Sequence, residues 1–416
     1  MLTASESRRS HESPINIPHG AVRSYADRVS EASEVGIPGG RRAHWLELIF
    51  DLVMVGYIGQ VAHLLHGDPG WAEVLVFFAL LAPAWWAWVN MTLTLNLFGA
   101  RVTPLVWAAV TAAMIAIGLM AAAVPEALTE RAGIFALGNA LIRFVWMVPW
   151  IARRRAIGVP LWRPIAFSGL PAVLWLISAI VPPPARFVLW AVAIGVEITL
   201  LAFLGSQTAW LQRSLDVDHL LERVSLLVVI VFGESILATI AQLDEHWTDA
   251  SLVTATLAFV AISLLAWVFF RYASGSAEAG LRRLHTAGRI GALRDAVMYL
   301  PFVLVAGIAL FASGLGTAVA EGSHALPSGA AACLAGGIVL FYLASVVESL
   351  RYGVPWRDTT MWGLPGLLLP WAIVPLAGLL TAEAVVVAVI VLIAVMIGLA
   401  EANLRRVRAR GERISA

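Results

Sequence analysis

The feature that most constrains the fold of this chain is a series of long apolar runs, separated by short stretches rich in Pro, Gly and charged residues. A helix needs about 20 mostly apolar residues to cross the hydrocarbon core of a bilayer. Of the 416 residues, 60% are hydrophobic and only 13% are charged, whereas about a quarter of the residues are charged in soluble domains. We therefore predict an all-α polytopic membrane protein.

The runs predict about twelve transmembrane helices. They lie at approximately 44–66, 71–98, 102–124, 133–151, 161–181, 186–206, 220–242, 249–272, 295–319, 327–349, 360–380 and 382–402. A short repeat, His44-Trp-Leu-Glu47 and His219-Leu-Leu-Glu222, opens the first and the seventh run. The membrane domain at 44–402 thus has possible halves, 44–206 and 220–402, that would form a 6+6 parallel repeat about an axis along the membrane normal.

The distribution of arginine predicts the orientation of the chain. All 28 residues counted as Lys or Arg are Arg. If the N-terminus is cytoplasmic, the outward loops contain only Arg131 and Arg186, and the remaining loop and tail arginines face inward, as the positive-inside rule requires. We expect a disordered cytoplasmic tail at 1–43, a basic cytoplasmic tail at 403–416, and a location in the inner (plasma) membrane.

Several acidic residues fall inside runs that otherwise would span lipid, and three of them are of particular interest. Glu47 and Asp51 are four residues apart, on one face of the first helix, and Glu234 lies about three turns beyond Glu222 in the seventh, beside Gly233. A carboxylate at bilayer depth costs at least about 2.5–3.5 kcal/mol on insertion scales, so it must face protein, a partner or water. We consider these three acids candidates for a coupling or ion site.

The same acids also have a purely structural interpretation, in which buried charges pair and only specify packing. Glu47 could pair with Arg223 or with a loop arginine, while Glu222 and Arg223 are expected to form an interfacial pair. Arg143 is the one arginine expected near mid-membrane, so it is a natural partner for a buried acid, and Glu197 in the sixth helix is a further candidate. Both interpretations remain open at this point.

Other kinds of site have little support in the sequence. The two His-x-x-Glu pairs have a spacing that can present two metal ligands on one face, but zinc and iron sites normally use three or four ligands, so we expect no metal and no cofactor. A nucleophile elbow, a phosphate-binding glycine loop and an HExxH motif are all missing, so we do not expect an enzyme. The expected partners are the lipid bilayer and a small solute or ion, and no nucleic acid.

Three aromatic side chains lie in the middle of the second run, at Trp85, Trp86 and Trp88. Aromatic residues at such positions usually pack the interior, and this is the interpretation we favour. An aromatic lining for a substrate is the alternative.

Three segments resemble the bacterial low temperature requirement A (LtrA) family. They are Trp45-Leu-Glu-Leu-Ile-Phe-Asp-Leu-Val, Trp85-Trp-Ala-Trp, and His219-Leu-Leu-Glu-Arg-Val-Ser-Leu-Leu-Val-Val-Ile-Val-Phe-Gly-Glu-Ser-Ile-Leu-Ala. The resemblance implies that the signature positions are Glu47, Asp51, Glu222, Arg223, Gly233 and Glu234. This chain departs from the family pattern at Asn96-Leu-Phe-Gly-Ala-Arg and Trp267-Val-Phe-Phe-Arg-Tyr, where the family tends to carry acids. The family is named for a growth phenotype, so the resemblance implies no reaction.

We interpret the chain as a proton- or cation-coupled transporter of a small solute, with Asp51 and Glu234 as coupling carboxylates. One alternative is a cation channel, because the Phe-Asp pair in the first run and the six-plus-six layout are similar to a family of lysosomal and prokaryotic potassium channels, although the Ser of their Phe-Ser-Asp is absent. Another is a non-transporting membrane protein that supports the envelope.

Overall fold

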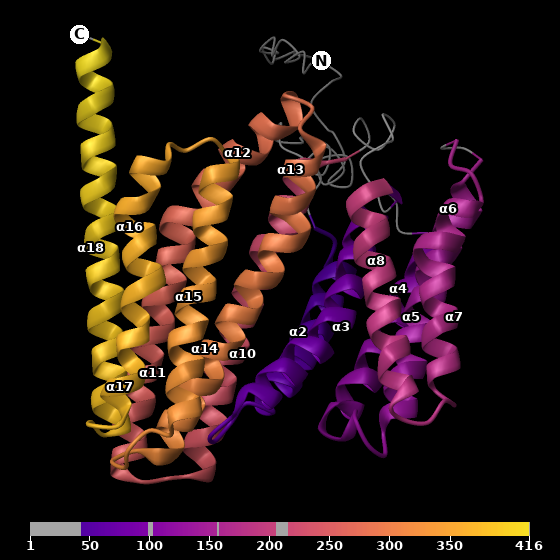
Figure 1. The fold of residues 1–416 in the computed structure, drawn as a ribbon. Coiled ribbons are helices and arrows are strands. Elements are labelled where there is room, and N and C mark those ends of the chain that lie inside the picture. Colours follow the sequence, from indigo (N-terminus) through magenta and orange to yellow (C-terminus); the bar gives the residue numbers. More distant parts are fainter. Residues whose placement is uncertain (1–42, 99–102, 156–157, 205–214, 416) are drawn as a thin grey trace, which may run out of the picture. The chain divides into compact units, whose positions relative to one another are not determined.

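The computed structural model describes residues 43–98, 103–155, 158–204 and 215–415, and the regular elements in these ranges are helices (Figure 1). The expected N-terminal tail at 1–43 lies outside them apart from its last residue. The first part of the chain forms α2 (Trp45–His63), α3 (Trp71–Phe98), α4 (Pro104–Ala123), η1 (Val124–Glu126), α5 (Ala132–Arg153), α6 (Trp162–Pro164), η2 (Ile165–Gly169), α7 (Leu170–Ser178) and α8 (Ala185–Leu204).

The second part continues from the same kind of apolar runs. It forms α10 (Val217–Glu245), α11 (Asp249–Val268), η3 (Phe269–Ala273), α12 (Ser274–Thr286), α13 (Ile290–Arg294), η4 (Asp295–Tyr299), α14 (Leu300–Glu321), α15 (Ser328–Arg351), α16 (Trp356–Leu368), η5 (Leu369–Ala372), α17 (Ile373–Ala377) and α18 (Ala382–Ser415). The basic tail expected at 403–416 continues α18 as far as Ser415.

Ten helices in the described ranges are long and apolar enough to cross a membrane, and they coincide with ten of the twelve expected runs. The prediction of an all-α polytopic membrane bundle is therefore confirmed. The two other runs, 161–181 and 186–206, are also helical, but a π-helical turn at η2 interrupts the first, and the described part of the second ends at Leu204. The total of twelve and the cytoplasmic placement of both termini stay predictions.

Helix packing divides around α2. On one side α4 contacts α2 and α5, and α7 packs against α5 and α8. On the other side α10 contacts α2, α11 and α14, while α14 packs closely against α15. The three helices α2, α10 and α14 all contact one another, and residues of all three line a common cavity.

Small residues allow the close approach of α14 and α15, as expected where lipid supplies no hydrophobic drive between helices. A Cβ atom added at Gly337 would lie 2.5 Å from the amide nitrogen of Phe311 and 2.6 Å from the carbonyl oxygen of Gly307. The neighbouring Gly336 has open space around it. The α14–α15 contact thus requires glycine at position 337 but not at 336.

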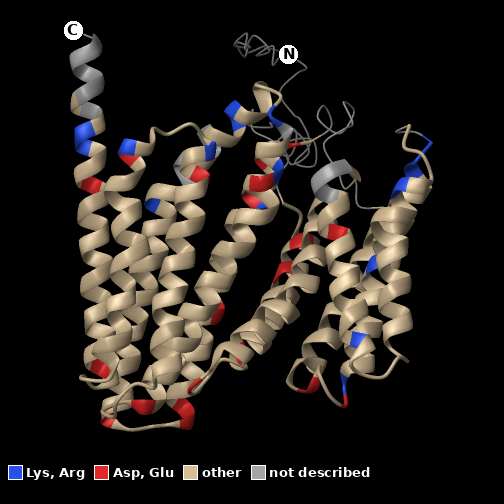
Figure 2. Cartoon of the chain, viewed as in Figure 1, with Lys and Arg blue, Asp and Glu red and all other residues tan. Residues whose placement is uncertain are grey.

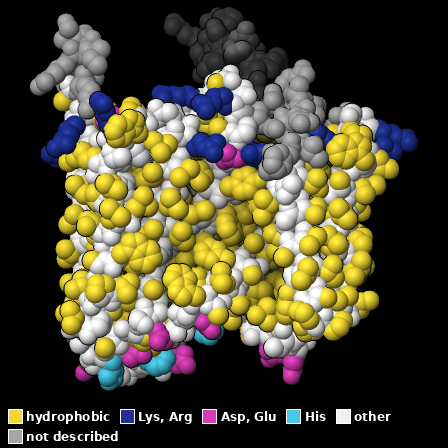
Figure 3. Space-filling view, viewed as in Figure 1, with side chains coloured by type: hydrophobic (Ala, Val, Ile, Leu, Met, Phe, Trp, Pro, Cys, Tyr) yellow, Lys and Arg dark blue, Asp and Glu magenta, His cyan; other side chains and the backbone are white. Residues whose placement is uncertain are grey.

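Charged side chains gather at the ends of the helices (Figures 2 and 3). Most arginines lie at the end where α18 ends, whereas acidic residues lie at both ends (Figure 2). Arg154 follows the last turn of α5 and Glu130 precedes its first, so the two mark opposite ends of one helix. This arrangement is the asymmetry on which the predicted orientation depends.

The orientation can be tested by thiol labelling in intact cells. The single native cysteine, Cys333, is buried and should not react. We expect Glu130→Cys to react with a membrane-impermeant maleimide from outside, and Arg154→Cys to react only after permeabilisation, because the arginine-rich end should face the cytoplasm. Labelling of Arg154→Cys in intact cells would contradict the predicted orientation.

The close helix contact gives a stability prediction. Gly337→Ala should lower the free energy of unfolding by about 1–3 kcal/mol, because the added methyl group overpacks the interface. Gly336→Ala, which meets no atom, is the matched control and should unfold like the parent protein. Thermal unfolding of the purified variants in detergent would measure both, and equal unfolding temperatures would show that the contact does not depend on glycine.

Candidate functional site

The candidate site lies where α2 and α10 run side by side from the same end of the bundle. The side chain of His44 caps α2 by accepting a hydrogen bond from the backbone N–H of Leu46, and Asp216 caps α10 by accepting one from the N–H of His219 at 3.1 Å. Because the two helices are parallel, residues in the first two turns of α2 face residues in the first two turns of α10. We call this contact the α2–α10 seam.

At this end of the seam, one arginine serves two carboxylates. The guanidinium of Arg223 donates from Nη1 to Oε2 of Glu47 at 3.1 Å, and from Nη2 to Oδ1 of Asp51 at 2.6 Å. All three side chains are buried. The four-residue spacing predicted that Glu47 and Asp51 share a face, and that face meets Arg223.

Three further side chains extend this charge network. Trp88 of α3 donates its indole N–H to Oδ1 of Asp51 at 2.8 Å, and Nε2 of His219 lies 2.9 Å from Oε2 of Glu47. The amide of Asn96 is oriented by the backbone of Asp216, whose N–H donates to Oδ1 and whose carbonyl accepts from Nδ2. Nδ2 of Asn96 therefore faces Nδ1 of His219 as a donor, at 3.0 Å. Nδ1 must accept, so Nε2 carries the hydrogen that His219 donates to Glu47.

The network leaves one oxygen and one nitrogen without a hydrogen-bond partner in the described ranges. Both Oδ2 of Asp51 and Nε of Arg223 are buried and unpartnered. A buried carboxylate oxygen in this situation is costly unless it binds a proton or another group. Chemically, Asp51 is thus a carboxyl group with one oxygen held by Arg223 and Trp88, and with the other available to carry a proton.

A second buried arginine shows what a fully compensated pair looks like. Arg143 donates from Nε and Nη2 to the two carboxylate oxygens of Glu197, at 2.8 and 2.7 Å, and from Nη1 to the carbonyl and side-chain oxygens of Asn139. Its guanidinium also lies 5.3 Å from the ring centre of Trp175. The acid that pairs with Arg143 is therefore Glu197. Every nitrogen of this guanidinium is bonded, which suits a structural role.

Glu234 lies further along the same seam, in a cavity of about 380 Å³ between α2, α10 and α14. Gln60, Ser235, Gln242 and Ser313 add polar groups to the lining. The Glu234 carboxylate rests against Gly59 of α2, where a Cβ atom would overlap it. Glycine at position 59 is thus what allows the acid to fit beside α2.

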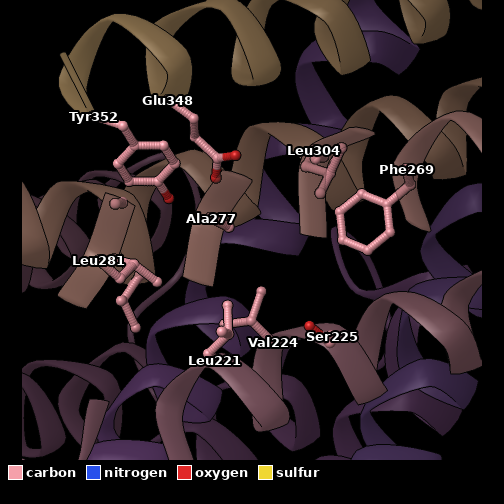
Figure 4. Close-up of a pocket in the computed structure, with 12 residues that line it drawn as sticks. Leu221, Val224, Ser225, Phe269, Ala277, Leu281, Leu304, Glu348 and Tyr352 are labelled. Carbon is pink, nitrogen blue, oxygen red and sulfur yellow. The ribbon is translucent and has the colours of Figure 1, made fainter. Parts of the chain in front are cut away.

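A second, water-sized cavity of about 20 Å³ lies beneath Glu348 of α15 (Figure 4). The carboxyl group of Glu348 and the ring of Tyr352 lie side by side over Leu221, Val224 and other apolar groups (Figure 4). Burial raises the pKa of the Tyr352 phenol, so its hydroxyl stays protonated at neutral pH.

The structure therefore brings only some of the predicted site residues together. Glu47, Asp51 and Arg223 form one cluster, and Glu234 lies apart from it in the cavity. The expected pair between Glu222 and Arg223 is wrong: Arg223 turns to α2, whereas Glu222 accepts a hydrogen bond from the backbone N–H of Ala43 at 2.9 Å. The reason is that consecutive helical residues point about 100° apart.

Sequence reasoning missed the parts of the network that are not acidic. Trp88 was expected to pack the interior, which it does, but it also donates to Asp51. Asn96 was noted only where the chain departs from the family pattern, and His219 only as one member of a possible metal pair. In the described residues, no group of three or more His, Cys, Asp and Glu side chains could hold a metal ion. The only signal for Trp88 was its position in mid-span.

Comparison with known proteins gives two results. The family described as bacterial low temperature requirement A protein (LtrA) matches residues 42–399, which include α2 to α8, α10 to α17 and most of α18. An uncharacterized protein of Rhizobium meliloti (strain 1021) is 29% identical over 248 residues. That similarity covers 55% of this chain and 58% of the relative, so the chain spans little more than half the length of this relative.

The shared arginine gives a stability prediction. Arg223→Met should cost about 3–5 kcal/mol of unfolding free energy, because it leaves buried carboxylates without their cation. Adding Asp51→Asn should restore part of the loss, since it removes one of those charges. Arg131→Met is the control: Arg131 pairs with Glu126 at 3.2 Å where both are exposed, and should cost at most about 1 kcal/mol. Denaturant unfolding would compare them, and equal effects at 223 and 131 would contradict the network.

Proposed function

The chain belongs to the bacterial low temperature requirement A (LtrA) family, and we propose that it is a proton- or cation-coupled transporter of a small solute in the inner (plasma) membrane. The observation that carries the proposal is Asp51, a buried carboxyl group with one oxygen held and the other unpartnered. Intramembrane acids of this kind are typical of proton and ion pathways.

Protonation of Asp51 would change the charge of this carboxyl group and also the contact between α2 and α10 in the seam. With Asp51 ionised, Arg223 attracts both Glu47 and Asp51 and holds α10 against α2. Protonation of Oδ2 removes one of the two negative charges that Arg223 faces and weakens this attraction. The free energy of proton binding is thereby linked to the contact between the two helices.

The cavity is placed to respond to such a change. Gly59, which meets the carboxylate of Glu234, lies eight residues beyond Asp51 on α2, or about 12 Å along the helix axis. The same two helices therefore carry the charge network at one end and line the cavity at the other. A small shift of α2 against α10 therefore alters the charge network and the cavity together. Coupling between an ion and a solute requires at least such a shared movement.

The contacts of the seam favour a transporter over an open channel. At the network end, the side chain of Arg223 lies between α2 and α10 and donates hydrogen bonds of 2.6–3.1 Å to its two acids, so the helices are in direct contact there. The cavity lies beyond this contact. A closed contact next to a solute-sized cavity suits alternating access, in which the two ends of a pathway open in turn. We propose no enzymatic activity and no nucleic-acid partner; the partners are the bilayer and the solute.

The proposal can be tested by flux into liposomes. Purified protein would be reconstituted with an internal pH dye, and proton and potassium gradients would be imposed separately in the presence of a solute library. We expect a solute-dependent, saturable proton flux that Asp51→Asn and Glu234→Gln reduce about tenfold or more, a barrier change of about 1.4 kcal/mol. Glu130→Gln, a carboxyl-to-amide change in an exposed turn, is the matched control and should keep the full flux.

Each alternative function gives a different result in this experiment. A saturable flux lost in both variants supports the transporter. A solute-independent ion leak that does not saturate, and that Asp51→Asn abolishes, would identify a channel. Tight liposomes with every solute, together with a lower unfolding temperature of both variants, would identify a structural membrane protein.

A further inference from the structure

The lining of the cavity around Glu234 is organised along one face of α10. Glu234, Ala238, Ala241, Gln242 and Glu245 all line it, at helical positions i, i+4, i+7, i+8 and i+11. Eleven residues make just over three turns and a rise of about 16 Å. The cavity thus has a half-buried carboxylate at one end and an exposed carboxylate at the other, on the same side.

A buried hydroxyl group in the wall has no partner. Ser313 of α14 is only 1% exposed, and its Oγ forms no hydrogen bond with any described residue. A helical serine that is shielded from water usually donates to the carbonyl four residues earlier, as Ser235 does to Val231 at 3.0 Å. The hydroxyl of Ser313 is therefore a polar group within the lining that a ligand would satisfy.

The charge of the lining is negative. Among the described residues that line the cavity there is no arginine. Burial and the neighbouring His63 lower the pKa of His66, in the loop after α2, to about 4, so this histidine is neutral at pH 7. The charges of Glu234 and Glu245 are thus not offset by His66, and the cavity favours cations.

The kind of cation follows from the other groups. No Phe, Tyr or Trp is found in the described lining, so it lacks the aromatic faces that bind quaternary ammonium groups. It offers instead oxygen acceptors on Gln60, Gln242 and Ser313, which suit ammonium groups that have N–H donors. The wall between the two acids includes Ala238 and Ala241, whose methyl groups suit an aliphatic chain.

We propose that this cavity binds a linear aliphatic polyamine, with one ammonium group at Glu234, a second at Glu245 and the methylene chain along the alanines between them. The inference names the substrate class of the transporter proposed above and rests on that function. Because Glu234 touches Gly59, a ligand held there also contacts the helix that carries Asp51.

Equilibrium binding tests the proposal without any gradient. The full-length protein would be placed in phosphatidylcholine nanodiscs at pH 7 and titrated calorimetrically with spermine, with butylamine as the single-amine probe and tetramethylammonium as the quaternary probe. We expect spermine to bind about tenfold or more tightly than butylamine, and tetramethylammonium to bind more weakly than either.

Variants assign each end of the ligand. Glu234→Gln should weaken spermine and butylamine alike, by about tenfold, whereas Glu245→Gln should weaken spermine about threefold and leave butylamine unchanged, because only the longer probe reaches it. Gly59→Ala should weaken both probes by displacing the Glu234 carboxylate. Gly56→Ala, one turn earlier with open space around it, is the matched control and should bind normally. Unchanged unfolding temperatures would confirm that Glu245→Gln and Gly56→Ala are folded.

Three results would overturn the inference. They are equal affinity for spermine and butylamine, equal loss of both probes in Glu245→Gln, or a tenfold fall in spermine affinity in nanodiscs that contain phosphatidylethanolamine, which would assign the site to a lipid headgroup. Failure of the proposed function looks different: spermine would bind as expected but would not move in the liposome assay. Conversely, coupled flux of another solute without spermine binding would overturn only the polyamine assignment.

Discussion

The structure depends on the cost of placing charge where no water can solvate it. In the membrane-spanning part of the chain, polar and oppositely charged side chains of other helices offset that cost. Each buried charge therefore also fixes which helices are neighbours. Arg223 is the clearest case, since its guanidinium binds Glu47 and Asp51 and thereby joins the first helix of the described chain to α10, more than 170 residues later. The α2–α10 seam, and the cavity further along it, follow from this contact.

The two buried arginines differ in how completely they are compensated, and this difference separates a structural pair from a candidate functional one. Arg143 faces one carboxylate and has all three nitrogens bonded. Arg223 faces two carboxylates, while its Nε and Oδ2 of Asp51 remain without partners among the described residues. A complete pair has a single stable arrangement, whereas an incomplete one can gain stability by binding a proton. Coupling requires the second kind.

How far the site could be predicted depends on how local its geometry is. The shared face of Glu47 and Asp51 follows from a spacing of four residues, and the pairing of Glu47 with Arg223 was one of the open alternatives. Two other contacts were not predictable: the hydrogen bond from Trp88 to Asp51 and the pairing of Arg143 with Glu197. Both depend on how the helices rotate about their axes when they pack. Glu222 and Arg223 illustrate the limit, since adjacent residues on one helix have unrelated partners.

By itself the sequence determined that the chain is an all-α membrane protein of the LtrA family with acidic residues inside its spans, because apolar length, charge placement and signature residues are all properties of local segments. Only the tertiary structure decided which charges compensate one another and which remain incomplete, and that Glu234 belongs to a cavity rather than to the charge network. The physical reason is that apolar length requires a helix to cross the bilayer, whereas partners and cavities arise only where the surfaces of separate helices meet.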